Sequence, residues 1–161
     1  MPLVHTAPPS STAADGEPVH EIVPGTTTGL VLIADHASNH VPADLADLGL
    51  PRAEFERHIA YDIGVAPLVH ALASRLGVPA VLTRFSRLVI DPNRGDDDPT
   101  LVMRLSDGAV IPANARLDAT GRQARIDRFW QPYDDAITAT IDAAFAAGRP
   151  PILFSLHSFT P

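Results

Sequence analysis

The sequence predicts an α/β fold: a three-layer αβα sandwich around a mixed, mainly parallel sheet. The first observation is a run of five apolar residues, 30–34 (LVLIA), of the kind found in strands buried on both faces. The second is a pair of long segments, 62–76 and 120–147, with apolar residues at helical spacing. The third is the order of the segments, because strands and helices that alternate along a chain favour layered packing.

The apolar run 30–34 ends in a polar cluster that includes Asp35, His36 and His40. In open α/β sheets, ligands bind just beyond the carboxyl ends of the strands. One carboxylate and two imidazoles at such a position form a candidate metal or acid–base site. Pro42 argues against a helix here, so the four-residue spacing of His36 and His40 is not expected to make a helical ligand pair.

Three helices are predicted in the first half of the chain. Residues 43–48 form a short helix that ends at Gly49, and residues 51–59 form another with a proline in its first turn. Residues 62–76 form a longer amphipathic helix, and Gly77 follows as its C-cap. Because of Pro67, this helix either starts near Ala66 or tolerates a proline in its first turns.

The longest predicted helix spans residues 120–147. Thr120 and Gln123 have the spacing of a capping box at its start, and Pro132 is expected to kink it. Seven large side chains form its apolar face: Ile126, Phe129, Trp130, Tyr133, Ile137, Ile141 and Phe145.

Four further segments are predicted to be strands. Residues 20–23 form a short edge strand, and residues 151–156 form the most apolar strand, which we expect at the centre of the sheet. Residues 79–83 and 87–91 are separated by too few residues for a helical crossover, so they are predicted to form a hairpin or one bent strand.

The composition limits the possible functions. The chain has 161 residues, enough for one domain, and a net charge of −7, so no basic field favours nucleic acid. It has no cysteine, which excludes disulfides and thiolate metal sites. No apolar run is long enough to span a membrane, and a cytoplasmic location is the default expectation. Residues 1–18, rich in proline, serine, threonine and alanine, are predicted to be a mobile tail before a domain of residues 19–161.

His36 and His157 are the strongest candidates for metal ligands. Each follows an apolar strand, so both can lie at the same edge of the sheet, where a metal needs ligands that converge from separate elements. The alternative is that each is an ordinary hydrogen-bonded histidine at the end of a strand. Asp62 has three possible roles: a ligand, a carboxylate that orients an imidazole, or the N-cap of the following helix.

A second group of candidates is basic. Asn93 and Arg94, with Arg84 and Arg87 nearby, form a possible anion clamp, because the planar guanidinium matches a carboxylate. The alternative is a set of surface arginines, which spacing alone does not exclude.

These residues lie in segments that resemble the N-formylglutamate amidohydrolase family, from about residue 28 to the end. The segments are DHASNHVP (35–42), HIAYDIG (58–64), SRLVIDPNR (86–94), FWQPYDDAI (129–137) and SLHSFTP (155–161). The family is similar in fold to zinc carboxypeptidases, whose D-x-N-R segment binds a substrate carboxylate and whose S-x-H-S segment carries a zinc-binding histidine. The resemblance thus implies roles for Asp91, Asn93 and Arg94, and for Ser155, His157 and Ser158.

The resemblance implies zinc-dependent hydrolysis of an N-acyl, for example N-formyl, amino acid. Zinc carboxypeptidases use H-x-x-E for their first two ligands, but this chain has Asn39 three residues after His36, and a neutral amide is a poor zinc ligand. Asp62 is therefore the expected third ligand or orienter. Arg84 or Arg87 is expected to stabilise the oxyanion.

The family's domain continues beyond the SLHSFTP segment, so this chain is shorter than the family's domain. The resemblance implies that the further part of the domain supplies a general base. We therefore expect these residues to be the N-terminal part of an amidohydrolase domain and inactive alone, with Phe159 and the outer edge of the last strand exposed. The alternative is a non-catalytic α/β module that binds a metal or a small carboxylate.

Overall fold

The computed structural model describes residues 16–26, 29–148 and 150–159. Most of the predicted tail, residues 1–18, lies outside the described residues. The sheet has the order β1-β3-β2-β6: β1 (His20–Val23), β3 (Ala80–Thr83), β2 (Leu30–Ala34) and β6 (Ile152–Ser155). β2 runs parallel to both of its neighbours, and only β1 is antiparallel. The fold is therefore α/β with a mixed, mostly parallel sheet, as predicted.

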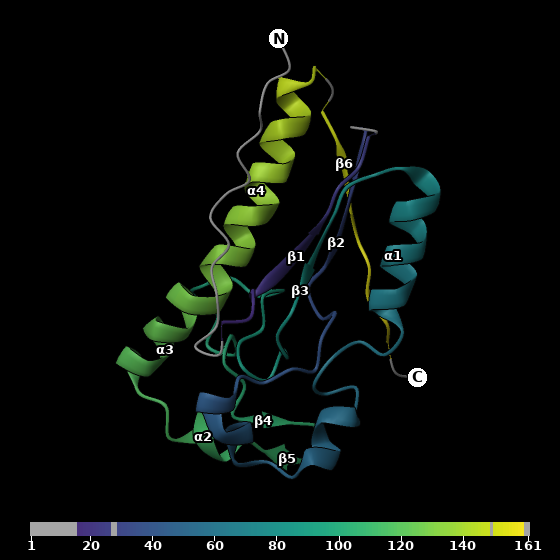
Figure 1. The fold of residues 1–161 in the computed structure, drawn as a ribbon. Helices are drawn as coiled ribbons and strands as arrows, with labels where there is room; N and C mark the ends of the chain where they lie inside the picture. The colour runs from purple at the N-terminus through teal and green to yellow at the C-terminus, as the bar shows by residue number, and fades with distance from the viewer. Residues whose placement is uncertain (1–15, 27–28, 149, 160–161) are drawn as a thin grey trace.

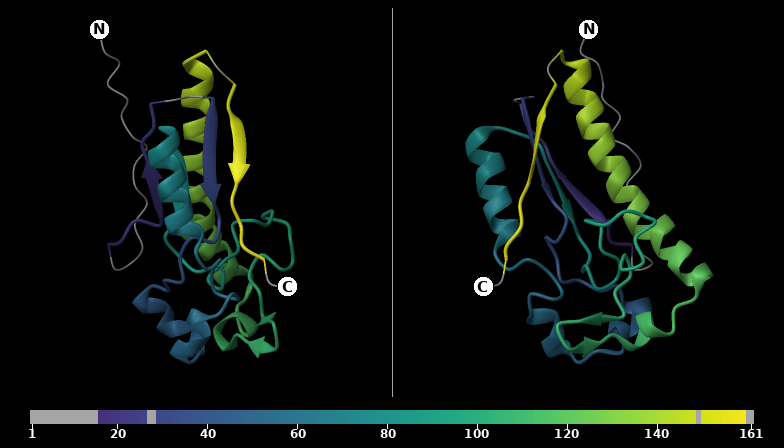
Figure 2. Two further views of the ribbon diagram at one scale, coloured as in Figure 1. Left: turned by 90° about the vertical axis from the view of Figure 1, so that its right-hand side faces the viewer. Right: turned by 180° about the vertical axis from the view of Figure 1, so that it is seen from behind.

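Helices lie on both faces of this sheet (Figure 1). α1 (Val65–Leu76) packs on one face and α4 (Gln131–Ala146) on the other, with β1, β2 and β3 between them. The views in Figure 2 show the same three layers from the side and from behind. This arrangement is consistent with the predicted αβα sandwich.

The side chains of β3 alternate between the two helical layers, as expected for a strand buried on both faces. Ala80 and Leu82 pack with Val69 of α1, whereas Val81 packs with Tyr133 of α4. The sheet thus has an apolar layer toward α1 and another toward α4, and the polar cluster that begins at Asp35 follows directly after β2.

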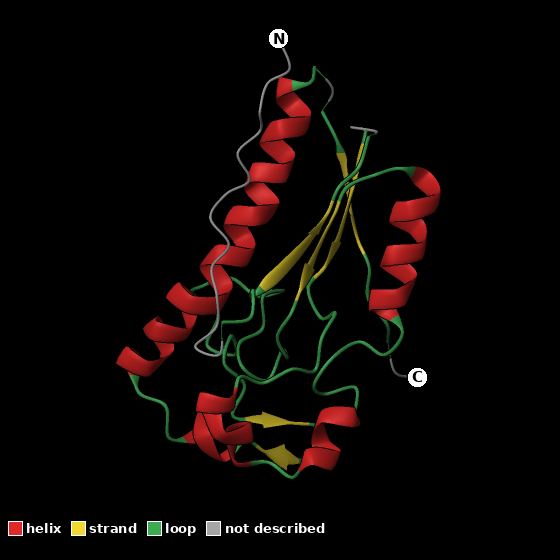
Figure 3. Ribbon diagram, in the orientation of Figure 1, coloured by secondary structure: helices red, strands yellow, loops and turns green. Residues whose placement is uncertain are grey.

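A smaller region of short elements lies beyond the carboxyl ends of the strands (Figure 3). It contains η1 (Ala43–Gly49), η2 (Arg52–Glu56), the hairpin of β4 (Leu105–Ser106) and β5 (Ala109–Val110), and α2 (Pro112–Ala115). The two helices predicted over residues 43–59 are thus short 3-10 segments. A second apolar core, which includes Leu48, Phe55 and Phe129, holds this region together.

The predicted strand over residues 87–91 is wrong, and with it the predicted hairpin. The segment is apolar because Leu88, Val89 and Ile90 are fully buried in the second core. Its backbone bonds elsewhere than to a neighbouring strand: Arg87 N–H donates to the carbonyl of Ala60, and Asp91 N–H to that of Leu101. Burial without a strand partner explains why an apolar run resembled a strand.

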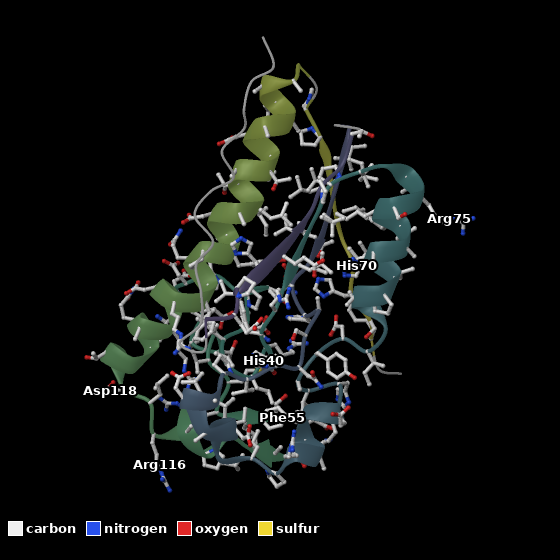
Figure 4. The ribbon with its side chains drawn as sticks, viewed as in Figure 1. His40, Phe55, His70, Arg75, Arg116 and Asp118 are labelled. Atoms are coloured by element: carbon white, nitrogen blue, oxygen red, sulfur yellow. The ribbon has the colours of Figure 1, made fainter. Side chains whose placement is uncertain are left out.

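The predicted long helix is a run of three segments: α3 (Ala119–Arg125), the π-helical η3 (Ile126–Trp130) and α4. The π turn directly precedes Pro132, which lacks the N–H that an α-helical bond needs. The predicted cap is also corrected. Asp118, labelled in Figure 4, accepts the N–H of Gly121, so the helix begins one residue before Thr120.

The last strand, predicted at the centre, is the outer strand of the sheet that the structure describes. All four residues of β6 are exposed, and Phe159 is 89% exposed. The expected exposure of this strand and of Phe159 is confirmed. In the described part of the chain, no helix has both the length and the apolar character needed to cross a membrane.

Candidate metal centre

The candidate site lies where β2 and β6 end, at the same edge of the sheet. His36 is the second residue after β2, and His157 is the second residue after β6. The strands are parallel, with Ile33 opposite Ser155, so both histidines leave the sheet side by side. Their ring centroids are 5.1 Å apart. The structure thus brings together the two histidines that the sequence indicated.

Asp62 lies between the two imidazoles and faces both. Its Oδ1 is 3.5 Å from Nδ1 of His36, and its Oδ2 is 3.1 Å from Nδ1 of His157. The N–H of Ser158 also donates to Oδ2. The N-cap of α1 is Gly64, without a side-chain hydrogen bond, so the capping role considered for Asp62 is wrong. Its carboxylate instead faces the two histidines.

These three side chains form a donor set suited to a divalent metal. One ligand atom from each of His36, Asp62 and His157 lies within 4.8 Å of the others. Nδ1 of His36 is buried and has no hydrogen-bond partner among the described residues, an arrangement that costs free energy unless something else satisfies the nitrogen. Two imidazoles and one carboxylate also leave one position open in a tetrahedral zinc site. The residues present therefore fit zinc.

Each histidine turns its other ring nitrogen to a buried carboxylate. Nε2 of His36 is 2.7 Å from Oδ1 of Asp91, and Nε2 of His157 is 3.3 Å from Oδ2 of Asp35. Metal-binding histidines usually donate their second N–H to such a group, which fixes the ring and its tautomer. Both rings share one orientation, with Nδ1 toward Asp62 and Nε2 away from it.

Neighbouring charged groups shift the pKa values of the two histidines and of Asp91. Burial opposes the charged imidazole, but Asp62 and Asp91 outweigh it and raise the pKa of His36. Burial also opposes ionised Asp91, yet His36 and Arg87 lower its pKa to about 2. A hydrogen bond to Asp35 raises the pKa of His157. The site therefore favours positive charge between its carboxylates.

A cavity of about 260 Å³ opens beside the histidines, and its lining includes Arg87, Asn93 and Ser158. The guanidinium of Arg87 lies 2.9 Å from Oδ2 of Asp91 and 3.6 Å from Oδ1 of Asp62. Three of the predicted catalytic or substrate-binding residues thus surround one space with the candidate metal ligands.

Two predicted residues are not brought to this space. Asn39 Nδ2 donates to the carbonyl of Phe55, labelled in Figure 4, so this amide does not join the histidines. Arg84 lies 3.8 Å from Glu17 and lines a separate cavity with His70, on the α1 side of the sheet. The sequence could not show which of Arg84 and Arg87 lies at the site. The chain turns between them, and this turn places the two side chains in different cavities.

Arg94 lies at the border of the site. Its Nε is 3.3 Å from Asp91, and Nη1 is 3.4 Å from Asp98. Its carbonyl accepts the indole N–H of Trp130, which holds the loop against η3. Arg94 is not among the described residues that line the cavity. Its guanidinium, which was predicted to bind a substrate carboxylate, instead contacts two acidic side chains of the protein.

Sequence reasoning missed the contact of Tyr133 with Asp35. The hydroxyl of Tyr133 on α4 donates to Oδ1 of Asp35 at 2.9 Å, and Ser155 Oγ lies 3.2 Å from Oδ2. The available signal was a tyrosine on the apolar face of a helix, because a buried hydroxyl there needs a partner. The pairing itself was not readable, since 98 residues separate Tyr133 from Asp35.

Comparison with known proteins places this geometry in a family. The model of the N-formylglutamate amidohydrolase family matches residues 28–161. No curated protein matches the chain. Among solved structures, the gene product Atu2144 from Agrobacterium tumefaciens has a TM-score of 0.87 and 29% identity, over 94% of this chain and 60% of the other.

The N-formylglutamate amidohydrolase from Ralstonia eutropha JMP134 has a TM-score of 0.70 and 24% identity. That match covers 88% of this chain and 57% of the other, and at this identity it shows a shared fold. The present chain thus spans about three fifths of the length of both structures. Because the family match covers most of the sequence, the chain belongs to the N-formylglutamate amidohydrolase family.

Proposed function

We propose that this chain provides the zinc-binding part of an amidohydrolase that cleaves N-acyl amino acids, with N-formylglutamate as the reference substrate. The observation that carries the proposal is the convergence of His36, Asp62 and His157, with both Nδ1 atoms facing the same carboxylate. Membership of the family supports the reaction class. The similarity to zinc carboxypeptidases that the sequence suggested belongs to the same proposal.

In this proposal His36, His157 and Asp62 hold the zinc ion, Asp62 through either oxygen. When bound, zinc supplies an electrophile for the acyl oxygen and lowers the pKa of a water molecule. The protein supplies orientation: Asp91 and Asp35 hold the two imidazoles so that both Nδ1 lone pairs face the metal position.

Arg87 is assigned to the negative charge that develops on the acyl oxygen. It lines the cavity, and its guanidinium is fixed by Asp91 and by Asp62, so little reorganisation is needed during the reaction. Asn93 and Ser158 supply polar groups in the same cavity. Arg94 is assigned to the substrate carboxylate, in competition with its contacts to acidic side chains.

The general base is left unassigned in this chain. Asp62 is the carboxylate among the described residues that line the cavity, and it faces both histidines as a ligand does. This observation favours a second candidate function, in which the chain binds a metal or a small carboxylate without catalysis. Loss of a general base typically costs about 10²- to 10⁴-fold in rate, so we expect no measurable turnover by the 161 residues alone.

The test is zinc binding by the purified chain, measured by competition with a chromophoric chelator. We expect one zinc per chain at micromolar affinity or tighter, and loss of binding in a His36→Ala, His157→Ala double variant. His58→Ala, which changes an exposed histidine, is the matched control. Absence of zinc binding would refute the proposal. Binding with zinc-dependent release of formate from N-formylglutamate would show that a base lies within these residues.

A further inference from the structure

His157 and His36 are supported by very different surroundings. The His36 side chain is only 2% exposed. His157 follows β6, whose four residues are all exposed, and its own side chain is 16% exposed. Side-chain hydrogen bonds therefore contribute more to the orientation of this ring.

Asp35 supplies that orientation from the neighbouring strand. It is 5% exposed, and Oδ2 faces both Nε2 of His157 at 3.3 Å and Oγ of Ser155 at 3.2 Å. Ser155 Oγ in turn lies 2.9 Å from the same nitrogen. Two oxygens from two strands thus converge on Nε2, which leaves Nδ1 to face Asp62.

The other oxygen of Asp35 is held by a residue of the helix α4. Tyr133 on α4 is 2% exposed, and its hydroxyl donates to Oδ1 at 2.9 Å. Its ring packs among apolar residues of β2, β3 and α4, so the hydroxyl has little freedom to move. The bond fixes the rotation of the carboxylate, and this fixes where Oδ2 lies.

This geometry argues against Asp35 as a general base. Both of its oxygens are engaged, and it lies on the Nε2 side of His157, away from Asp62. It is also not among the described residues that line the cavity beside the histidines. A base must reach the water that it activates, so Asp35 acts through His157 and not on substrate.

We propose that Tyr133 and Asp35 are positioning residues that hold His157 with Nδ1 toward the metal position, an inference that rests on the proposed zinc site. The chain of contacts runs from α4 through Asp35 to the ring of His157. It fixes the histidine that follows the exposed strand β6.

The test is Tyr133→Phe, which removes one hydroxyl and keeps the ring. Outer partners of metal-binding histidines typically contribute about 10- to 100-fold in metal affinity, so zinc should bind about tenfold more weakly or worse. The cobalt-loaded variant should also show altered visible absorption, because the His157 ring is no longer held. Tyr61→Phe removes the same atom from the other tyrosine, beside Asp62, and should leave the affinity and the spectrum unchanged.

Asp35→Asn is the second variant, in case Tyr133→Phe folds poorly. The amide keeps the shape but loses the charge that holds Nε2–H, so zinc affinity should fall by a similar factor. Thermal unfolding of the metal-free proteins separates the alternatives. Lower stability with unchanged zinc affinity and cobalt spectrum in both variants would mean a structural role and overturn the inference. If the unchanged chain binds no zinc, the proposed function fails first, and this inference with it.

Discussion

The strands β3 and β6 both run parallel to β2, on its two sides, yet they differ in burial. All residues of β3 are buried, whereas all residues of β6 are exposed. β3 has β1 beyond it and helices on both faces, while β6 pairs with β2 alone among the described strands. An apolar sequence therefore does not determine burial, because the neighbours of a strand decide it.

The same contrast divides the candidate site. His36, Asp62 and Asp91 are all at most 5% exposed and are positioned by the core. His157 is 16% exposed and depends on its contacts to Asp35 and Asp62. Hydrogen bonds orient both histidines, but the half around His36 is enclosed by the core and the half around His157 is more exposed. The predictions below test this difference.

The largest expected effect is on stability without metal. His36→Ala leaves Asp62 and Asp91 buried with one positive partner fewer, and breaking such a pair typically costs about 3 kcal/mol or more. His157→Ala removes a more exposed ring, for which a loss of about 1 kcal/mol is expected. Chemical denaturation of the metal-free variants measures both free energies of unfolding. Equal losses would mean that the two halves are supported alike.

The second prediction concerns Arg94, which contacts Asp91 of the buried half from the border of the site. Arg94→Lys keeps the charge but replaces a planar fork with a point charge. Loss of one charge-assisted hydrogen bond, about 1.5 kcal/mol, corresponds to about tenfold weaker binding of N-formylglutamate to the zinc-loaded chain. Isothermal titration of wild type and variant provides the measurement, with Arg75→Lys as a surface control. Unchanged affinity would rule out a carboxylate-binding role for Arg94.

The third prediction concerns the exposed strand. An open edge with apolar side chains promotes pairing between chains, and a lysine on that edge opposes it. Ile152→Lys should therefore reduce self-association, and burial of one such side chain suggests a change of about tenfold in the dissociation constant. Sedimentation over a range of concentrations is the measurement. Leu68→Lys changes an exposed side chain of α1 and should have no effect, and equal behaviour of the two variants would contradict the assignment of the edge.

The smallest effect is expected at α3, away from both strands. Asp118→Ala removes the side chain that caps the helix, at a cost of about 1 kcal/mol in the free energy of unfolding. Thr120→Ala should change it by a few tenths at most, because Thr120 lies inside the helix. Denaturant titration of the two variants gives the comparison. A larger loss for Thr120→Ala would restore the capping box suggested by the sequence.

Much of the fold was readable from the sequence because local pattern and burial agree. The strand at residues 30–34, the helix capped by Gly77 and the strand before Arg84 each combine an apolar period with a clear boundary. Residues 87–91 failed for the opposite reason: they are buried like a strand, but their backbone finds partners in loops.

The site was readable in part for a similar reason. His36 and His157 each follow a strand, so parallel pairing alone brings them together. The contacts of Asp35 with Tyr133, and the separation of Arg84 from the cavity, depend on how helices and loops close around the sheet. These long-range contacts cannot be predicted from the local sequence.

The most direct test of the account is X-ray absorption spectroscopy of the zinc-loaded chain. We predict two imidazole nitrogens and at least one oxygen at about 2.0–2.1 Å from the metal. His157→Ala should remove one imidazole from the scattering and leave the other. A chain that binds no zinc, or zinc without two imidazoles, would contradict the convergence of His36, Asp62 and His157 on one metal position.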